Sequence, residues 1–167
     1  MVRAYVALGA NIGDPQAQVR AAIAALDSMD GTRVIASSSL YLTPPWGVVD
    51  QPPFINAVVA VDTSLMPHAL LARLHELETQ AGRVRDGTRN GPRPLDLDLL
   101  LYGHQCLHDA GLQVPHPRLA ERAFVLLPLA DIAADVEVPG QGRVADLLSR
   151  VDGQGCQRLG NVRSPRG

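Results

Sequence analysis

The spacing of hydrophobic residues over the first hundred positions switches between the two-residue period of a strand and the wider period of a helix. Residues 2–8 predict a strand that ends at Gly9. Hydrophobic residues then recur at helical spacing after an Asp14-Pro15 cap, which predicts a helix to about Asp27. The same reasoning predicts further strands over residues 33–42, 54–61 and 95–101, and a second helix from about Pro67 to Gly82.

The order strand–helix–strand–strand–helix–strand is typical of a ferredoxin-like α+β fold, an antiparallel sheet with both helices on one face. Residues 54–61 are nearly all apolar, which favours a central strand. After Gly103 the elements are short, and a last helix is expected around residues 144–151 in a short C-terminal α/β extension. Residues 1–152 are therefore expected to form a single domain. Residues 153–167 have no apolar period and carry three arginines without an acid, so a disordered tail is expected there.

Composition narrows the function classes. The chain has 167 residues, the size of one ordinary domain, and its net charge of −2 gives no general attraction to nucleic acid or membranes. All 15 basic residues are arginine, which excludes a Schiff-base lysine and a Walker A phosphate loop. The two cysteines form no CxxC motif, and the apolar run at the N-terminus is too short for a signal peptide or a membrane span. A monomer in the reducing cytoplasm is expected.

Two acids in the run Asp96-Leu97-Asp98 form the most informative motif. Alternate residues of a strand share a face, so Asp96 and Asp98 project together with their Cα atoms roughly 6–7 Å apart. Mg²⁺ is commonly held by one or two carboxylates, with water and substrate phosphate completing its shell. The alternative is a solvated strand face that carries two acids by chance.

Arginines crowd the segment immediately before this strand. Arg83, Arg85, Arg89 and Arg93 lie within eleven residues, offset only by Asp86. Arginine binds phosphate oxygens through two parallel hydrogen bonds, and a loop that contains glycines can bring such side chains onto a ligand. An arginine-rich loop is more often a solvated surface, but next to a carboxylate pair it indicates a polyphosphate site. Phosphoryl transfer depends mainly on positioning and charge neutralisation of this kind.

A second candidate site lies on the third predicted strand, where Phe54 and Asn56 share a face. A phenylalanine ring can stack on a flat ligand, and an asparagine amide can read the edge of a heterocycle. The alternative is a core phenylalanine beside a polar strand-end residue. His75 and Glu78, three residues apart on the second helix, are by default a polar flank.

These segments together resemble the 6-hydroxymethyl-7,8-dihydropterin pyrophosphokinase family of the folate pathway. The matching segments lie in order over roughly four-fifths of the chain, and the Gly-Pro-Arg-x-Leu-Asp-Leu-Asp run is the most specific of them. They are residues 7–11 (ALGAN), 41–47 (YLTPPWG), 50–52 (DQP), 54–57 (FINA), 82–85 (GRVR), 91–98 (GPRPLDLD) and 114–117 (VPHP).

The resemblance implies an ATP-dependent diphosphokinase that transfers pyrophosphate from ATP to the pterin alcohol by direct displacement, giving AMP and the pterin diphosphate. Asp96 and Asp98 would hold two Mg²⁺ ions, and Arg83 and Arg93 would clamp the transferred group as their loop closes. The implied pterin-binding residues are Thr43, Pro44, Pro45, Trp46, Phe54, Asn56 and Phe124. The implied ATP-binding residues are His75, Glu78, Arg85, Arg93, Leu99, His116 and Arg122.

Three positions depart from the family pattern. Asn90 stands where some members carry an aromatic residue in the closing loop, Pro117 replaces a tyrosine of some members, and His75 replaces a glutamine. A simple kinase that yields ADP is the alternative among enzymes. A ferredoxin-like binding module without catalysis is the alternative of another class, and its RNA-binding form is disfavoured by 4% aromatic residues and the negative charge.

Overall fold

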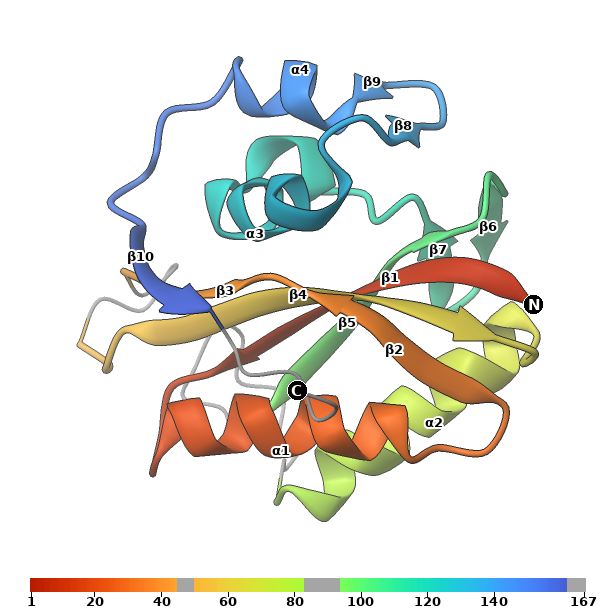
Figure 1. Cartoon of the computed structure of the whole chain (residues 1–167), viewed down its shortest axis with the longest axis horizontal. Coiled ribbons are helices and arrows are strands. Elements are labelled where there is room, and N and C mark those ends of the chain that lie inside the picture. The colour runs from red at the N-terminus through yellow and green to blue at the C-terminus, as the bar shows by residue number, and fades with distance from the viewer. Residues whose placement is uncertain (45–49, 83–93, 162–167) are drawn as a thin grey trace.

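An antiparallel sheet runs through the middle of the protein, with helices on both of its faces (Figure 1). The computed structural model describes residues 1–44, 50–82 and 94–161. Within these residues the sheet has six strands in the order β10-β3-β4-β1-β5, and β2 also pairs with β4. The strands are β1 (Val2–Ala10), β2 (Thr32–Ser37), β3 (Ser39–Thr43), β4 (Phe54–Thr63), β5 (Asp96–Tyr102) and β10 (Gln157–Asn161).

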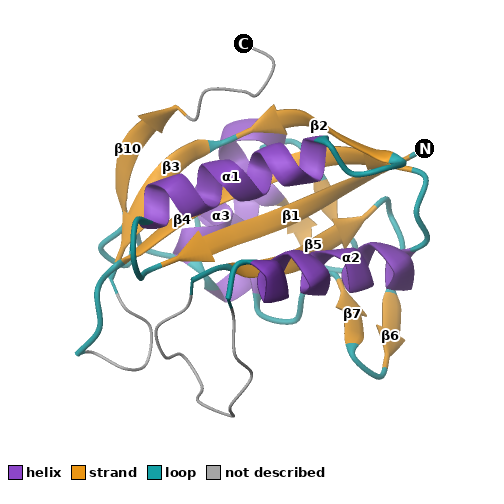
Figure 2. Ribbon diagram, turned by 90° about the horizontal axis from the view of Figure 1, so that it is seen from below, coloured by secondary structure: helices purple, strands orange, loops and turns teal. Residues whose placement is uncertain are grey.

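Helices α1 (Pro15–Asp27) and α2 (Pro67–Gln80) lie side by side on one face of the sheet (Figure 2). The Asp14 cap is confirmed, because its carboxylate accepts a hydrogen bond from the Ala17 amide at 3.2 Å. The ferredoxin-like order of strands and helices is confirmed as well. The single strand expected over residues 33–42 is instead two, since the Ser38 hydroxyl accepts from the Val58 amide and so replaces a ladder bond between strands.

The C-terminal extension covers the opposite face. It consists of a 3₁₀ turn η1 (Leu119–Glu121), helices α3 (Ala123–Ala133) and α4 (Val144–Leu148), and a small ribbon formed by β8 (Glu137–Val138) and β9 (Gly142–Arg143). A second ribbon, formed by β6 (Leu107–Asp109) and β7 (Leu112–Val114), packs instead against the core under α1 and α2. Alternate residues of β4 enter two different cores. Ile55 and Val59 pack under α1 and α2, whereas Val58 and Ala60 pack under α3. Burial of both faces explains why this strand is almost entirely apolar.

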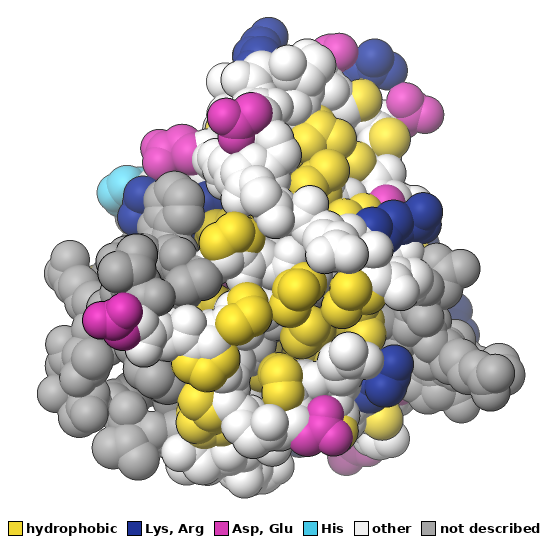
Figure 3. Space-filling view, turned by 90° about the vertical axis from the view of Figure 1, so that its left-hand side faces the viewer, with side chains coloured by type: hydrophobic (Ala, Val, Ile, Leu, Met, Phe, Trp, Pro, Cys, Tyr) yellow, Lys and Arg dark blue, Asp and Glu magenta, His cyan; other side chains and the backbone are white. Residues whose placement is uncertain are grey.

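The expectation of a disordered tail from residue 153 is wrong for residues 157–161, which form β10 at the edge of the sheet and pair with β3. Residues 157–160 are exposed on this edge, so no buried face imposes an alternating pattern that the sequence could reveal. Leu159 is 40% exposed, and hydrophobic side chains form a central band on this side of the molecule (Figure 3). Residues 162–167 lie outside the described part of the chain.

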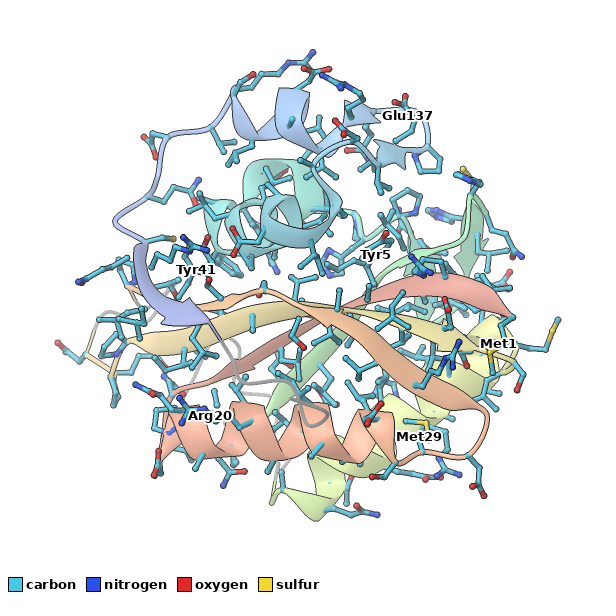
Figure 4. The ribbon with its side chains drawn as sticks, viewed as in Figure 1. Met1, Tyr5, Arg20, Met29, Tyr41 and Glu137 are labelled. Atoms are coloured by element: carbon cyan, nitrogen blue, oxygen red, sulfur yellow. The ribbon has the colours of Figure 1, made fainter. Side chains whose placement is uncertain are left out.

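A partly buried polar network ties α3 to this end of the sheet. The Tyr41 hydroxyl donates to the Asp131 carboxylate at 3.0 Å, and the Ser39 amide donates to the same group at 3.1 Å. Arg158 of β10 then donates to the Ser39 hydroxyl at 2.9 Å. Burial, together with the hydrogen bond to Asp131, raises the pKa of Tyr41 to about 12, so the hydroxyl stays a donor. Figure 4 shows Tyr41 between the sheet and α3. No helix of the described residues has the length and apolar character needed to cross a membrane.

Candidate active site

A pocket of about 270 Å³ opens between the sheet and the start of α3, on the face opposite α1 and α2. Strands β1, β3, β4 and β5 supply its floor, and residues 116–125 supply the remaining wall. The lining residues are Ala7, Leu8, Gly9, Thr43, Pro44, Phe54, Asn56, Asp96, Asp98, His116, Arg122, Phe124 and Val125. The pocket therefore unites the acidic motif and the Phe54–Asn56 pair, which the sequence places some forty residues apart.

The two carboxylates lie beside the smallest residues of the neighbouring strand. Asp96 is paired with Gly9 and Asp98 with Ala7 across the β1–β5 ladder. Directly opposite residues of an antiparallel pair share a face, so these small side chains leave free space next to the acids. The predicted alternation is confirmed: Asp96 and Asp98 are half-buried in the pocket, while the intervening Leu97 is buried in the core under α1 and α2.

Asn56 is held in place by contacts on both sides. Its side-chain amide donates to the Thr43 hydroxyl at 2.7 Å, and the residue is 9% exposed. On the other side, a Cβ atom on Gly9 would lie only 2.7 Å from Asn56 Oδ1. Glycine at position 9 is therefore what lets the amide lie over β1. From the sequence, Gly9 is expected only to end the first strand. In the structure, β1 continues to Ala10.

Gly9 also connects the two parts of the pocket. It pairs with Asn56 on one side and with Asp96 on the other. These three residues form one row across the sheet, with the amide at one end and the carboxylate at the other. A ligand that reads the amide and a group that binds the carboxylate would thus meet above Gly9.

Arg122 brings positive charge to the opposite wall, just before α3. Its guanidinium carbon lies 5.4 Å from the centre of the Phe124 ring, within the range of a cation–π contact. Its buried Nε has no hydrogen-bond partner among the described residues. Burial, and next the nearby Arg118, lower the pKa of Arg122, but a guanidinium remains charged at neutral pH. A buried, unsatisfied donor on a charged group suits an anionic ligand.

His116 reaches the pocket as a neutral ring. Its Nδ1 accepts a hydrogen bond from the Arg118 amide at 3.2 Å, and its own amide donates to the Leu100 carbonyl at 2.9 Å. Burial, followed by the charge of Arg122, lowers the pKa of His116 to about 4. The accepting Nδ1 assigns the proton to Nε2, which can then donate to a ligand.

The stability of the Mg²⁺-free protein should depend on this ring. An unfolded histidine takes up a proton near pH 6.5, whereas folded His116 does so only near pH 4. The unfolded state therefore binds more protons in this window, and the free energy of unfolding should fall as the pH drops from 6.5 to 4. Urea unfolding of the wild type and of His116→Gln at several pH values measures the effect, and the variant should show the smaller fall. Equal slopes in the two proteins would contradict the buried neutral ring.

Not all of the expected site residues lie in the pocket. Glu78 does not line the pocket, because its side chain is 2% exposed on the α2 face of the sheet and accepts from the Leu97 amide at 2.8 Å. Its contact with ATP stays a prediction. The Leu99 side chain is likewise buried in the core on that face. His75 lies exposed on α2, away from the pocket lining, and its role stays a prediction. Pro45, Trp46, Arg83, Arg85, Asn90 and Arg93 lie outside the described residues.

The fold and the pocket together define a ferredoxin-like α+β protein in which the Asp96–Asp98 pair and the Phe54–Asn56 pair line one pocket. Residues 5–134 match the sequence profile of the 7,8-dihydro-6-hydroxymethylpterin-pyrophosphokinase (HPPK) family. The chain belongs to this family, whose members are transferases.

Individual proteins agree with this assignment. A 2-amino-4-hydroxy-6-hydroxymethyldihydropteridine pyrophosphokinase of Pseudomonas aeruginosa is 47% identical over 157 residues, which cover 94% of this chain and 96% of the relative. The protein of the same name from Methylorubrum extorquens is 46% identical over 95% of this chain and 99% of its own length. The crystal structure of Plasmodium falciparum HPPK-DHPS with pteroate has the same fold, with a TM-score of 0.71 over 89% of this chain and 42% of that chain, at 14% identity.

Proposed function

We propose that this enzyme transfers the pyrophosphoryl group of ATP to the hydroxymethyl group of 6-hydroxymethyl-7,8-dihydropterin, giving AMP and the pterin diphosphate for folate biosynthesis. The family membership and the names of its relatives support this reaction. The observation that carries it in the structure is the row of Asn56, Gly9 and Asp96, which joins a heterocycle slot to an acidic site within one pocket.

The pterin ring would lie between Phe54 and Phe124, which line the pocket from the sheet and from α3. Two aromatic side chains on a flat heterocycle offer stacking contacts. The Asn56 amide would read the polar edge of the ring, and its bond to Thr43 fixes its orientation in advance. Pro44 closes the end of the slot at β3. Pro45 and Trp46, which follow it in sequence, are proposed to extend this wall.

Substituting Gly9 should weaken pterin binding indirectly, through the orientation of Asn56. In Gly9→Ala the new methyl group would displace Asn56, because the Cβ would lie 2.7 Å from Oδ1. The pterin Kd should rise about tenfold, the equivalent of one hydrogen bond, while the ATP Kd stays unchanged. Calorimetry with each ligand measures this.

Gly153→Ala is the matched control for this substitution, because no atom lies within 4 Å of the Cβ position there. It should bind both ligands as the wild type does. Unchanged pterin affinity in Gly9→Ala would show that the orientation of Asn56 does not matter for binding.

The phosphates of ATP would lie over β5 between the carboxylates and Arg122. Asp96 and Asp98 face one side of this space and the Arg122 guanidinium faces the other. Neutral His116 can add a hydrogen bond from Nε2 without adding charge. The pocket is near the lower size limit of ligand sites, so the adenosine part would extend beyond it. His75, Arg85 and the backbone at Leu99 remain proposed contacts on that outer side.

The donor set fits Mg²⁺. No group of three or more His, Cys, Asp or Glu side chains gathers among the described residues, so these positions form no closed protein cage for a metal. A pair of carboxylates with room beside it is the arrangement that Mg²⁺ uses when phosphates and water complete its shell. Asp96 and Asp98 would hold two Mg²⁺ ions, which would neutralise charge on the phosphates and on the attacking oxygen.

The transfer is a single displacement. The pterin hydroxymethyl oxygen forms a bond to the β-phosphorus of ATP and releases its proton to the solvent, and the bond from the β-phosphorus to the oxygen shared with the α-phosphate breaks. AMP keeps that oxygen. The residues of the chain hold the two reactants in line, which is the main requirement of such a reaction. Arg83 and Arg93 are proposed to clamp the transferred group as their loop closes over the site and excludes water.

The nucleotide product tests this function. Incubation with ATP, Mg²⁺ and the reduced pterin should yield AMP and the pterin diphosphate in equal amounts. ADP with a pterin monophosphate would show a simple kinase instead. Binding of the pterin without any nucleotide product would show a binding module.

A further inference from the structure

A glutamine near the C-terminus is bonded to the wall of the pocket. The side chain of Gln154 accepts from the Ala123 amide through Oε1 at 3.1 Å and donates to the Glu121 carbonyl through Nε2 at 3.0 Å. These two groups lie on either side of Arg122. A single side-chain amide thus fixes the backbone just before and just after the residue that brings positive charge to the pocket.

The Ala123 amide is a donor that the helix cannot satisfy by itself. The first amides of a helix have no partner within it, and the capping position of α3, Arg122, forms no side-chain cap. Gln154, which follows in sequence by 31 residues, provides the acceptor instead. The neighbouring amide of α3 belongs to Phe124, which lines the pocket. The bond from Gln154 therefore holds the segment that carries both ligand-facing side chains of this wall.

The segment around Gln154 is itself fixed at several points. The backbone amide of Gln154 donates to the Asp152 carboxylate at 2.9 Å. Gly155 packs so closely on Pro44 that an added Cβ would lie 2.9 Å from the proline Cγ. From Gln157 the chain continues as β10, which pairs with β3. This connection therefore runs from the start of α3 to the end of β3, and Figure 1 shows it descending from α4 to the sheet.

The backbone of Gln154 has a conformation that favours glycine over a residue with a side chain. Its φ of +49° lies in the left-handed region, where glycine is comfortable and a residue with a Cβ is strained. Among the described residues it is the one non-glycine with positive φ. The strain persists only where surrounding contacts over-determine it, and here the contacts are the two bonds to the wall of the pocket.

We propose that Gln154 is a positioning residue of the reaction, which holds Arg122 over the substrates by capping α3 from the C-terminal segment. The proposal rests on the proposed function, and it assigns to the active site a part of the chain that lies beyond the residues matched by the family. Gln154 touches no substrate and acts through Arg122.

The test uses Gln154→Gly, which removes the side chain and also relieves the backbone strain. If the side chain had a merely structural role, its removal would lower the thermal midpoint and leave kcat/KM of the folded enzyme unchanged. We expect kcat/KM to fall about tenfold, as misplaced reacting groups cause, while the thermal midpoint stays at or above that of the wild type. Gln157→Ala, an exposed glutamine three residues on, is the matched control and should keep full activity.

A double-mutant cycle shows whether the effect passes through Arg122. In an Arg122→Ala background, Gln154→Gly should cost less than about twofold, because its target is gone. The same tenfold loss in both backgrounds would overturn the proposal, and so would full activity of Gln154→Gly.

Hydrogen exchange separates this proposal from the proposed function. Exchange at the Ala123 amide should be at least about tenfold faster in Gln154→Gly than in Gln157→Ala, since its acceptor is lost. This readout needs no substrate. A wild type without turnover would refute the proposed function alone, whereas unchanged exchange at Ala123 would overturn the role of Gln154.

Discussion

Asp96→Ala and Asp98→Ala should each lower turnover by roughly a thousandfold, the size of effect found when a group that stabilises charge in the transition state is removed. Both carboxylates face the pocket from β5 and neither fills the core, so the loss should come without unfolding. Steady-state rates at saturating ATP and pterin, over a range of Mg²⁺ concentrations, measure it. Raising Mg²⁺ should not restore the rate, because the ligand itself is missing.

Glu137→Ala is the control for these two variants. Glu137 is an exposed acid on β8, on the far side of α3 from the sheet (Figure 4). Its removal changes the net charge by the same amount and should leave turnover as in the wild type. If either aspartate variant kept near-normal turnover in Mg²⁺, the assignment of the metal to this strand would be wrong.

Asn56→Ala should raise the Kd of the pterin by about a hundredfold and change the Kd of ATP by less than about threefold. The ring would lose the hydrogen bonds of the amide, and a site left with unpaired polar groups discriminates strongly. Phe54→Leu should have a smaller effect in the same direction, since it keeps apolar volume but removes the stacking face. Calorimetry on each variant with each ligand gives the four constants needed.

Thr43→Val tests whether the orientation of Asn56 matters. The valine keeps the shape of the side chain but removes the hydroxyl that accepts from the amide at 2.7 Å. Pterin affinity should fall by about fivefold, the equivalent of one neutral hydrogen bond.

Equal losses for pterin and ATP in Asn56→Ala would indicate a folding defect instead of a pterin slot.

Much of the fold could be predicted because the central sheet imposes strong patterns. The nearly unbroken apolar run at residues 54–61 follows from burial on both faces of β4, and the alternation around Asp96 follows from burial on one face of β5. The cap at Asp14 has a local chemical signature that needs no tertiary context. These signals are all contained within a few neighbouring residues.

The parts that the sequence did not reveal depend on contacts between distant segments. Strand β10 is an exposed edge strand without a buried face, so its pattern resembles that of a polar tail. The sequence predicts that Glu78 lies on a polar, exposed flank of its helix. Its carboxylate is instead buried, because the Leu97 amide of β5 donates a hydrogen bond to it. Gln154 reaches Ala123 across 31 residues through a side-chain amide, which no periodicity marks.

The role of Gly9 could not be decided from the sequence, although a glycine near the end of a strand is easily noticed. Its place at the end of a strand predicts a turn, and only the register with β4 shows that its missing side chain makes room for Asn56. A glycine inside a strand often marks a close approach of another group, and that reading would have identified it. The acidic side of the pocket could be predicted from the sequence, because acids at alternate positions of a strand share one face.

Both substrates are proposed to meet in the pocket between β5 and α3. A crystal structure of the enzyme with Mg²⁺, the reduced pterin and an ATP analogue that cannot be cleaved between its α- and β-phosphates tests it most directly. It should show the pterin ring between Phe54 and Phe124, with its polar edge on Asn56, and the phosphates between Asp96, Asp98 and Arg122. A pterin or a polyphosphate bound on the face of α1 and α2, away from these side chains, would contradict the account.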